Sequence, residues 1–132
     1  MRIYLDTVVI IYLIETVEPF ITTLGKRLGT PNTVQVCSEL SWLECRVKPM
    51  REEATVLLAA YERYFNHVTN EMIPLTREVM DHATALRARY SFKTPDAIHL
   101  AAAIVGQCDT FLTNDRRLSK CSEIKVEVLP NA

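Results

Sequence analysis

The sequence predicts an α/β domain with a mostly parallel sheet of about five strands and helices on both faces. Short apolar runs bounded by turn residues are typical of buried strands, and longer segments with apolar residues every three or four positions are typical of amphipathic helices. These two kinds of segment alternate along the chain of 132 residues. Such alternation is typical of parallel sheets, because a helix usually connects one parallel strand to the next.

Short apolar segments mark the expected strands. The first is Ile-Tyr-Leu at residues 3–5, which ends at Asp6. The others are expected at residues 34–37, 71–75, 110–113 and 125–129. Segment 71–75 has the weakest pattern, whereas the first is apolar enough to be a buried strand.

Helices are expected at residues 8–15, 18–28, 39–48, 52–65, 77–90 and 97–105. Ser38 and Thr76 are suited to cap two of them, and Thr94-Pro95 indicates a helix start with Thr94 as the cap. Pro49 is expected to stop the third helix, since helices usually end before a proline. The rows expected to face the core are Leu40, Leu43 and Val47 in the third helix and Val56, Ala59, Ala60 and Tyr64 in the fourth.

Length and composition indicate one globular domain over residues 1–132. The net charge of −1 argues against a protein that binds nucleic acid through bulk positive charge. The apolar run at residues 8–14 is too short to cross a bilayer, so we expect neither a membrane span nor a secretory leader. The four cysteines form no Cys-x-x-Cys pair. They are expected to be free thiols of a cytoplasmic protein and not zinc ligands.

Four acidic residues lie where parallel sheets bind ligands, which is beyond the carboxyl ends of the strands. Asp6 follows the first strand and Asp115 follows the fourth, so they meet if these strands are neighbours. Asp96 begins the apolar helix 97–105, and Glu44 lies beside the apolar row of the third helix. We therefore expect these carboxylates to approach one another.

Carboxylates that share an apolar site repel one another unless a cation compensates them. A site made only of oxygen ligands favours Mg²⁺ or Mn²⁺, and either ion polarises a phosphoryl oxygen and activates a bound water. The four acids therefore predict phosphodiester hydrolysis at a metal site.

Each acid also has a purely local interpretation. Asp6 would cap the helix that follows it, and Asp96 would interact with a helix dipole. Asp115 would be a turn residue, and Glu44 would pair with Lys48 one helical turn later. On residue types and spacing alone, the metal site and these local roles stay open as alternatives.

Four segments together resemble the PIN-domain nucleases, and specifically the small VapC-type toxins of toxin–antitoxin pairs. They are Tyr4-Leu5-Asp6-Thr7 with the apolar run 9–14, Ser38-Glu39-Leu40-Ser41 leading to Glu44, Thr-Pro-Asp-Ala-Ile-His-Leu-Ala-Ala at 94–102, and Asp-Thr-Phe-Leu-Thr-Asn-Asp-Arg-Arg-Leu at 109–118. They follow the family's order and cover essentially the whole chain. The resemblance implies a PIN-like fold with Rossmann-like layering and an endoribonuclease that uses Mg²⁺ or Mn²⁺.

The resemblance also implies residue roles and partners. Asp6 and Asp96 match direct metal ligands, and Glu44 and Asp115 match ligands that bind directly or through water. Hydroxyl residues expected to support the metal site are Thr7 and Thr113. Similar toxins cleave RNA, form homodimers and are inhibited by a VapB-like antitoxin whose C-terminal segment enters the active-site groove.

Other residues near the acids have two interpretations. Basic side chains that either solvate the surface or hold RNA phosphates are Arg46, Lys48, Arg116 and Arg117. His99 lies one turn after Asp96. We expect it to pack in the buried helix with a local hydrogen bond and not to act as a catalytic base.

Val8 departs from the family's pattern. Asn or Ser usually follows the Asp-Thr pair in the family as a polar partner of the metal site, and its loss weakens metal binding. Val8 therefore favours an alternative in which a PIN-fold module has lost catalysis and acts by binding a protein or RNA partner. Phosphotransferases of the haloacid dehalogenase type need a second aspartate at this position, and receiver domains need an acidic pair near the first strand. Neither pattern is present.

Overall fold

A computed structural model describes residues 1–130 of the chain. Its five strands are all parallel and lie in the order β3-β2-β1-β4-β5. They are β1 (Arg2–Leu5), β2 (Val34–Ser38), β3 (Glu71–Ile73), β4 (Thr110–Thr113) and β5 (Lys125–Val128). The first and fourth strands are neighbours, with Tyr4 opposite Phe111. The predicted parallel sheet is therefore confirmed.

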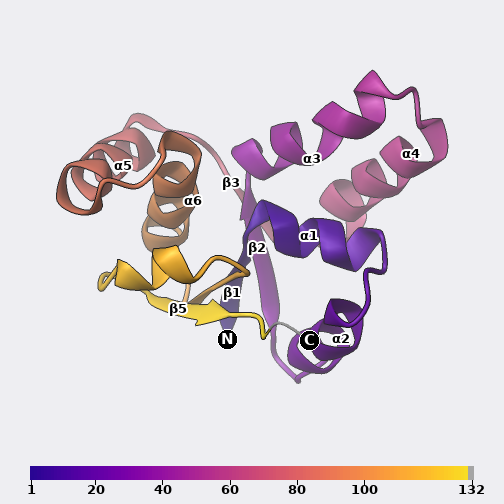
Figure 1. The fold of residues 1–132 in the computed structure, drawn as a ribbon, viewed down its shortest axis with the longest axis horizontal. Coiled ribbons are helices and arrows are strands. Elements are labelled where there is room, and N and C mark those ends of the chain that lie inside the picture. Colours follow the sequence, from indigo (N-terminus) through magenta and orange to yellow (C-terminus); the bar gives the residue numbers. More distant parts are fainter. Residues whose placement is uncertain (131–132) are drawn as a thin grey trace.

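Helices cover both faces of the sheet (Figure 1). One face is covered by α5 (Arg77–Tyr90) and α6 (Thr94–Val105), and the other by α1 (Thr7–Ile14), α2 (Phe20–Leu28), α3 (Glu39–Arg51) and α4 (Thr55–Arg63). Two shorter helices are the π-helix η1 (Tyr64–Val68) and the 3-10 helix η2 (Arg116–Lys120). No helix in the described part of the chain is long and apolar enough to span a membrane.

The alternation of side chains along the central strands divides the core into two layers. In β1, Tyr4 packs with the residues of α5 and α6, whereas Ile3 and Leu5 pack with those of α1 and α2. In β4, Phe111 packs in the layer of α5 and α6, and Leu112 packs in the layer of α1 and α2. All five side chains are fully buried. The carboxyl ends of both strands are therefore held between two close-packed layers.

The buried face of α3 differs from the predicted one. Leu43 and Val47 were expected in the core, but they are 57% and 43% exposed. The residues that are buried are Ser41, Cys45 and Pro49. Ser41 can be buried because its hydroxyl accepts a hydrogen bond from the Ser38 backbone N–H at 3.2 Å. Small side chains fill this space, and Leu43 and Val47 face outward.

The boundary between α3 and α4 also differs from the prediction. Pro49 does not end α3, which continues to Arg51 although the proline cannot donate a backbone hydrogen bond. The next helix begins at Thr55 and not at residue 52, since Glu53 has a φ of 54°, outside the helical region. Val56 was expected in the core and is 86% exposed, whereas Tyr61 is buried.

Candidate active site

Asp6 lies where β1 passes into α1. Its backbone N–H donates to the Leu112 carbonyl at 3.0 Å, which extends the pairing of β1 with β4 by one residue. Its carboxylate accepts the Thr7 N–H at Oδ1 (2.9 Å) and the Thr113 hydroxyl at Oδ2 (2.7 Å). Asp6 therefore caps α1, and the two hydrogen bonds hold its carboxylate in one orientation.

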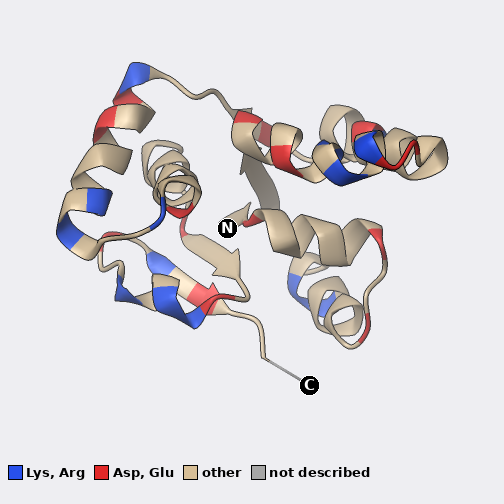
Figure 2. Ribbon diagram, turned by 45° about the horizontal axis from the view of Figure 1, so that its top comes forward, with Lys and Arg blue, Asp and Glu red and all other residues tan. Residues whose placement is uncertain are grey.

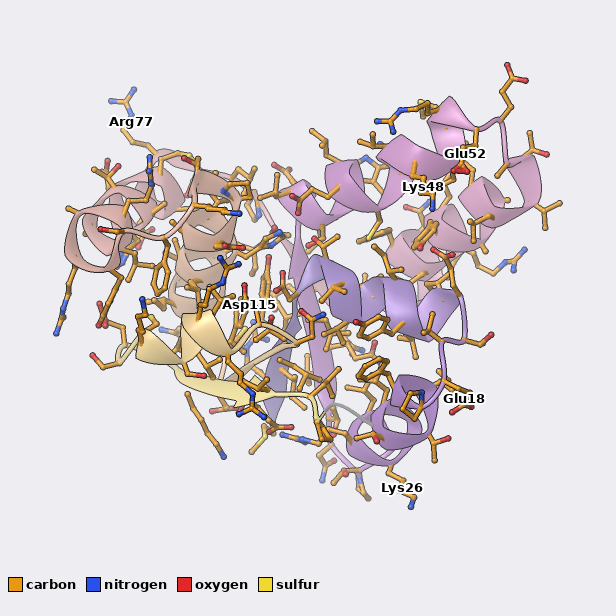
Figure 3. All side chains as sticks on the ribbon, viewed as in Figure 1. Glu18, Lys26, Lys48, Glu52, Arg77 and Asp115 are labelled. Carbon is orange, nitrogen blue, oxygen red and sulfur yellow. The ribbon has the colours of Figure 1, made fainter. Side chains whose placement is uncertain are left out.

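Asp115 lies just beyond β4, near the centre of the molecule between α6 and α1 (Figure 3). Its backbone N–H donates to the Thr113 hydroxyl at 3.1 Å, so one hydroxyl connects Asp115 with Asp6. The carboxylate accepts the backbone N–H of Arg117 and pairs with its guanidinium, with Nη2 2.7 Å from Oδ2. The Arg117 hydrogen bonds lower the pKa of Asp115.

Asp96 lies in the first turn of α6, which begins at Thr94 with Lys93 at the cap position, one residue earlier than predicted. Burial raises the pKa of the Asp96 carboxyl, and the nearby carboxylates of Asp6 and Asp115 raise it further. Three aspartates from separate segments therefore lie within electrostatic range of one another, as the strand-end positions predicted.

Glu44 makes different contacts from the three aspartates. Its Oε1 accepts the Thr7 hydroxyl at 2.7 Å and lies 2.6 Å from His99 Nε2. Burial opposes ionisation of Glu44, but the hydrogen bonds from His99 and Thr7 outweigh burial and lower its pKa. The predicted pair with Lys48 does not form, since Lys48 lies near Glu52. The sequence indicated a buried His99 but not its contact with Glu44.

The four acids are not arranged as the ligands of one metal ion. Among the described residues, no group of three or more His, Cys, Asp or Glu side chains is arranged to hold a metal ion. Glu44 lines a pocket of about 290 Å³ between α1, α3 and α4, apart from the pocket of Asp96. The donors nevertheless fit a hard divalent cation, because all are carboxylate oxygens and Asp96 is crowded by like charge.

Basic residues near Asp96 come mainly from η2. Asp96 lines a pocket of about 200 Å³ together with the basic residues Lys93, Arg117 and Lys120. Arg116 is exposed on the same 3-10 helix. Figure 2 shows the basic positions of this segment beside the acidic position at its start. Positive charge therefore lines the pocket that holds Asp96.

The two basic candidates on α3 are placed differently. The Arg46 guanidinium lies 3.5 Å from the centre of the Trp42 ring and 3.9 Å from Glu62. Lys48 lies with Glu52 at the far end of α3 from Asp115 (Figure 3). The structure therefore brings Arg117 to the aspartates but not Lys48, and it uses Arg46 in packing α3 against α4.

Asp96→Asn is expected to stabilise the metal-free protein by roughly 0.5–1 kcal/mol at pH 7. Folding raises the pKa of the Asp96 carboxyl. The protonated carboxyl is therefore tolerated in the folded protein below about pH 4, and the wild-type protein loses stability as the pH rises through the folded pKa and the carboxyl ionises. Solvent screening of the half-buried carboxylate and its favourable place at a helix N-terminus keep the gain small. Urea unfolding with a chelator at pH 7 measures the gain, which should disappear near pH 4. An equal or lower stability at pH 7 would contradict the crowding of Asp96.

Comparison with known proteins identifies the family. The sequence pattern of the PIN domain matches residues 3–124, a range that contains all four acids. No curated protein sequence matches significantly. A chain in the crystal structure of VapBC2 from Rickettsia felis bound to a DNA fragment from their promoter has a TM-score of 0.78 at 15% identity, covering 98% of this chain and 100% of that chain. A chain of a toxin–antitoxin complex from Klebsiella pneumoniae has a TM-score of 0.63 at 20% identity, covering 92% of this chain and 93% of that chain. The chain belongs to the PIN domain family.

Proposed function

We propose that the protein is an endoribonuclease that depends on Mg²⁺ or Mn²⁺. The crowding of Asp96 by Asp6 and Asp115 at the carboxyl ends of β1 and β4 supports this most directly. A divalent cation relieves such crowding, and carboxylate oxygens suit these two ions. When bound, the ion supplies an activated water and neutralises charge on the phosphodiester.

The protein's side chains have distinct roles in this proposal. Asp6 and Asp96 would hold the ion directly, and Glu44 and Asp115 would hold it directly or through water. Two hydroxyls orient these acids in advance, since Thr113 donates to Asp6 and Thr7 donates to Glu44. Orientation by such partners commonly decides metal affinity.

Substrate binding is assigned to the basic residues around the Asp96 pocket. RNA phosphates carry the negative charge that lysine and arginine contact, whereas base contacts select the sequence. The residues best placed are Lys93, Arg116, Arg117 and Lys120. Arg46 and Lys48 are less suited, because they lie along α3 and neither lines the pocket of Asp96.

The proposal extends to a toxin role with a VapB-like antitoxin and a homodimer. Two structural relatives are chains of toxin–antitoxin complexes. In addition, α3 presents an outward apolar row in which Leu43, Val47 and Met50 are 57%, 43% and 56% exposed. Apolar rows of this kind usually contact a partner. We assign the row to the antitoxin because it lies on the helix that carries Glu44, so a segment covering it lies next to the site.

Metal removal tests the proposed activity. Purified protein is incubated with structured RNA in excess Mg²⁺ or Mn²⁺, with and without EDTA. We expect cleavage only with metal, and full recovery when Mg²⁺ is restored. Cleavage that survives EDTA would rule out the metal mechanism, and no cleavage under any condition would rule out the nuclease.

One alternative has a specific observation in its favour. Val8 occupies the position of a usual polar partner, and it packs with the apolar layer of α1 and α2. A PIN-fold module that only binds a protein or RNA partner would tolerate this change. Such a module would bind RNA in a gel-shift assay without cleaving it in Mg²⁺ or Mn²⁺.

A further inference from the structure

A buried chain of hydrogen bonds lies behind Glu44. His99 Nε2 is 2.6 Å from Glu44 Oε1, and His99 Nδ1 is 2.7 Å from the Tyr4 hydroxyl. The Tyr4 hydroxyl donates to Ser38 Oγ at 2.8 Å. Tyr4 and Ser38 are fully buried, and His99 is 2% exposed. The chain therefore links α6, β1 and β2 to the carboxylate on α3.

The ring of Tyr4 is itself held in place. It stacks on Phe111 with ring centres 5.3 Å apart and planes 8° apart. His99 meets the edge of Tyr4, with ring centres 5.8 Å apart and planes at 62°. Among the described residues, no buried side-chain nitrogen or oxygen lacks a hydrogen-bond partner. His99 is therefore fixed through both ring nitrogens and by its packing.

The contact between His99 and Glu44 requires one proton between the two atoms. A carboxylate can only accept hydrogen bonds, so the proton in this 2.6 Å contact is on His99 Nε2. Oε1 then accepts two hydrogen bonds, from His99 Nε2–H and from the Thr7 hydroxyl. Within residues 1–130 these are the hydrogen bonds that the Glu44 carboxylate makes, and Oε2 takes part in neither.

We propose that His99 is a positioning residue that engages one oxygen of Glu44 and leaves the other, Oε2, free to accept a ligand. This inference rests on the proposed metal-dependent function. His99 does not touch the reacting atoms in this role. It would select one rotamer of Glu44, in which Oε2 would be the oxygen left to hold a divalent ion. Removing a partner of this kind typically lowers metal affinity by about 10–100-fold.

Two amide variants separate the hydrogen bond to Glu44 from the packing of the ring. His99→Gln carries its amide nitrogen about as far from the backbone as Nε2, so it still donates to Glu44. His99→Asn is shorter and reaches only toward Tyr4. We expect Mn²⁺ affinity, measured by electron paramagnetic resonance, to fall about 10-fold or more in His99→Asn and about threefold or less in His99→Gln. Equal losses in both, or none, would overturn the positioning role. Thermal unfolding of both variants confirms that they remain folded.

A second readout needs no metal. Nitrogen-15 spectra of the His99 ring in the metal-free protein should show a proton on Nε2, and Glu44→Gln should change the Nε2 signal more than the Nδ1 signal. A bare Nε2 would overturn the inference even if the protein cleaves RNA. If the spectra agree but the wild-type protein neither binds Mn²⁺ nor cleaves RNA, the proposed function fails while the contact between His99 and Glu44 stands.

Discussion

Asp6→Asn is expected to lower the rate of RNA cleavage by about 10³-fold, equivalent to about 4 kcal/mol of transition-state stabilisation. Asp6 is a proposed direct ligand, and the change removes its charge while keeping its shape. The Thr7 N–H and the Thr113 hydroxyl donate to different oxygens of the Asp6 carboxylate, and asparagine replaces one of these oxygens with an NH₂ group that donates instead of accepting. The remaining site then lacks both a charge and a fixed orientation. Single-turnover cleavage of a labelled RNA in saturating Mg²⁺ measures the effect.

The matched control for Asp6→Asn is Asp81→Asn on α5. Asp81 is an exposed aspartate outside the site, so its change also removes one negative charge. We expect Asp81→Asn to cleave at the wild-type rate within about twofold, since exposed substitutions away from special features have small effects. If Asp6→Asn retains more than about a tenth of the wild-type rate while folded, Asp6 is not a direct metal ligand.

Phe111→Ala is expected to destabilise the fold by about 3–5 kcal/mol, a large part of the stability of an ordinary domain. Phe111 is fully buried in β4, with β1 on one side and β5 on the other. Truncation leaves a cavity where its ring stacks on Tyr4. Urea unfolding followed by circular dichroism gives the free-energy difference at unchanged m-value.

Phe111→Leu serves as the control for the size of the cavity. It keeps most of the buried apolar volume but removes the flat ring, so we expect a loss of about 1–2 kcal/mol. A loss below about 1.5 kcal/mol for Phe111→Ala would mean that the core closes around the gap. In that case the stack on Tyr4 would not be the rigid support that His99 requires.

The meeting of Asp6 with Asp115 follows from the sequence because strand ends in a parallel sheet share one edge. The two apolar runs that precede them are short and buried, which leaves little freedom in register. Asp96 is similarly predictable, since Pro95 places it in the first turn of a buried helix. Helix starts and strand ends of this kind depend on a few neighbouring residues, and they lie in the structure at or next to the positions that the sequence predicts.

Glu44 was harder to predict because its helix carries two candidate faces. The spacing of Leu40, Leu43 and Val47 fits a core-facing row, yet small side chains face the sheet instead. Which face is buried depends on the space left by other elements, and no local pattern contains that information. The contact of Glu44 with His99 joins residues 55 positions apart, so it too depends on the tertiary fold.

The ion pair between Arg117 and Asp115 affects how the proposed metal would load. Arg117 already supplies positive charge at Asp115, so this part of the acidic edge is compensated before any ion arrives. A metal ion binding at Asp115 would then have to replace the Arg117 guanidinium. In such an exchange, occupancy follows the concentration of free ion. The fraction of protein molecules that carry the ion would thus follow the concentration of free divalent ions, and folding alone would not set it.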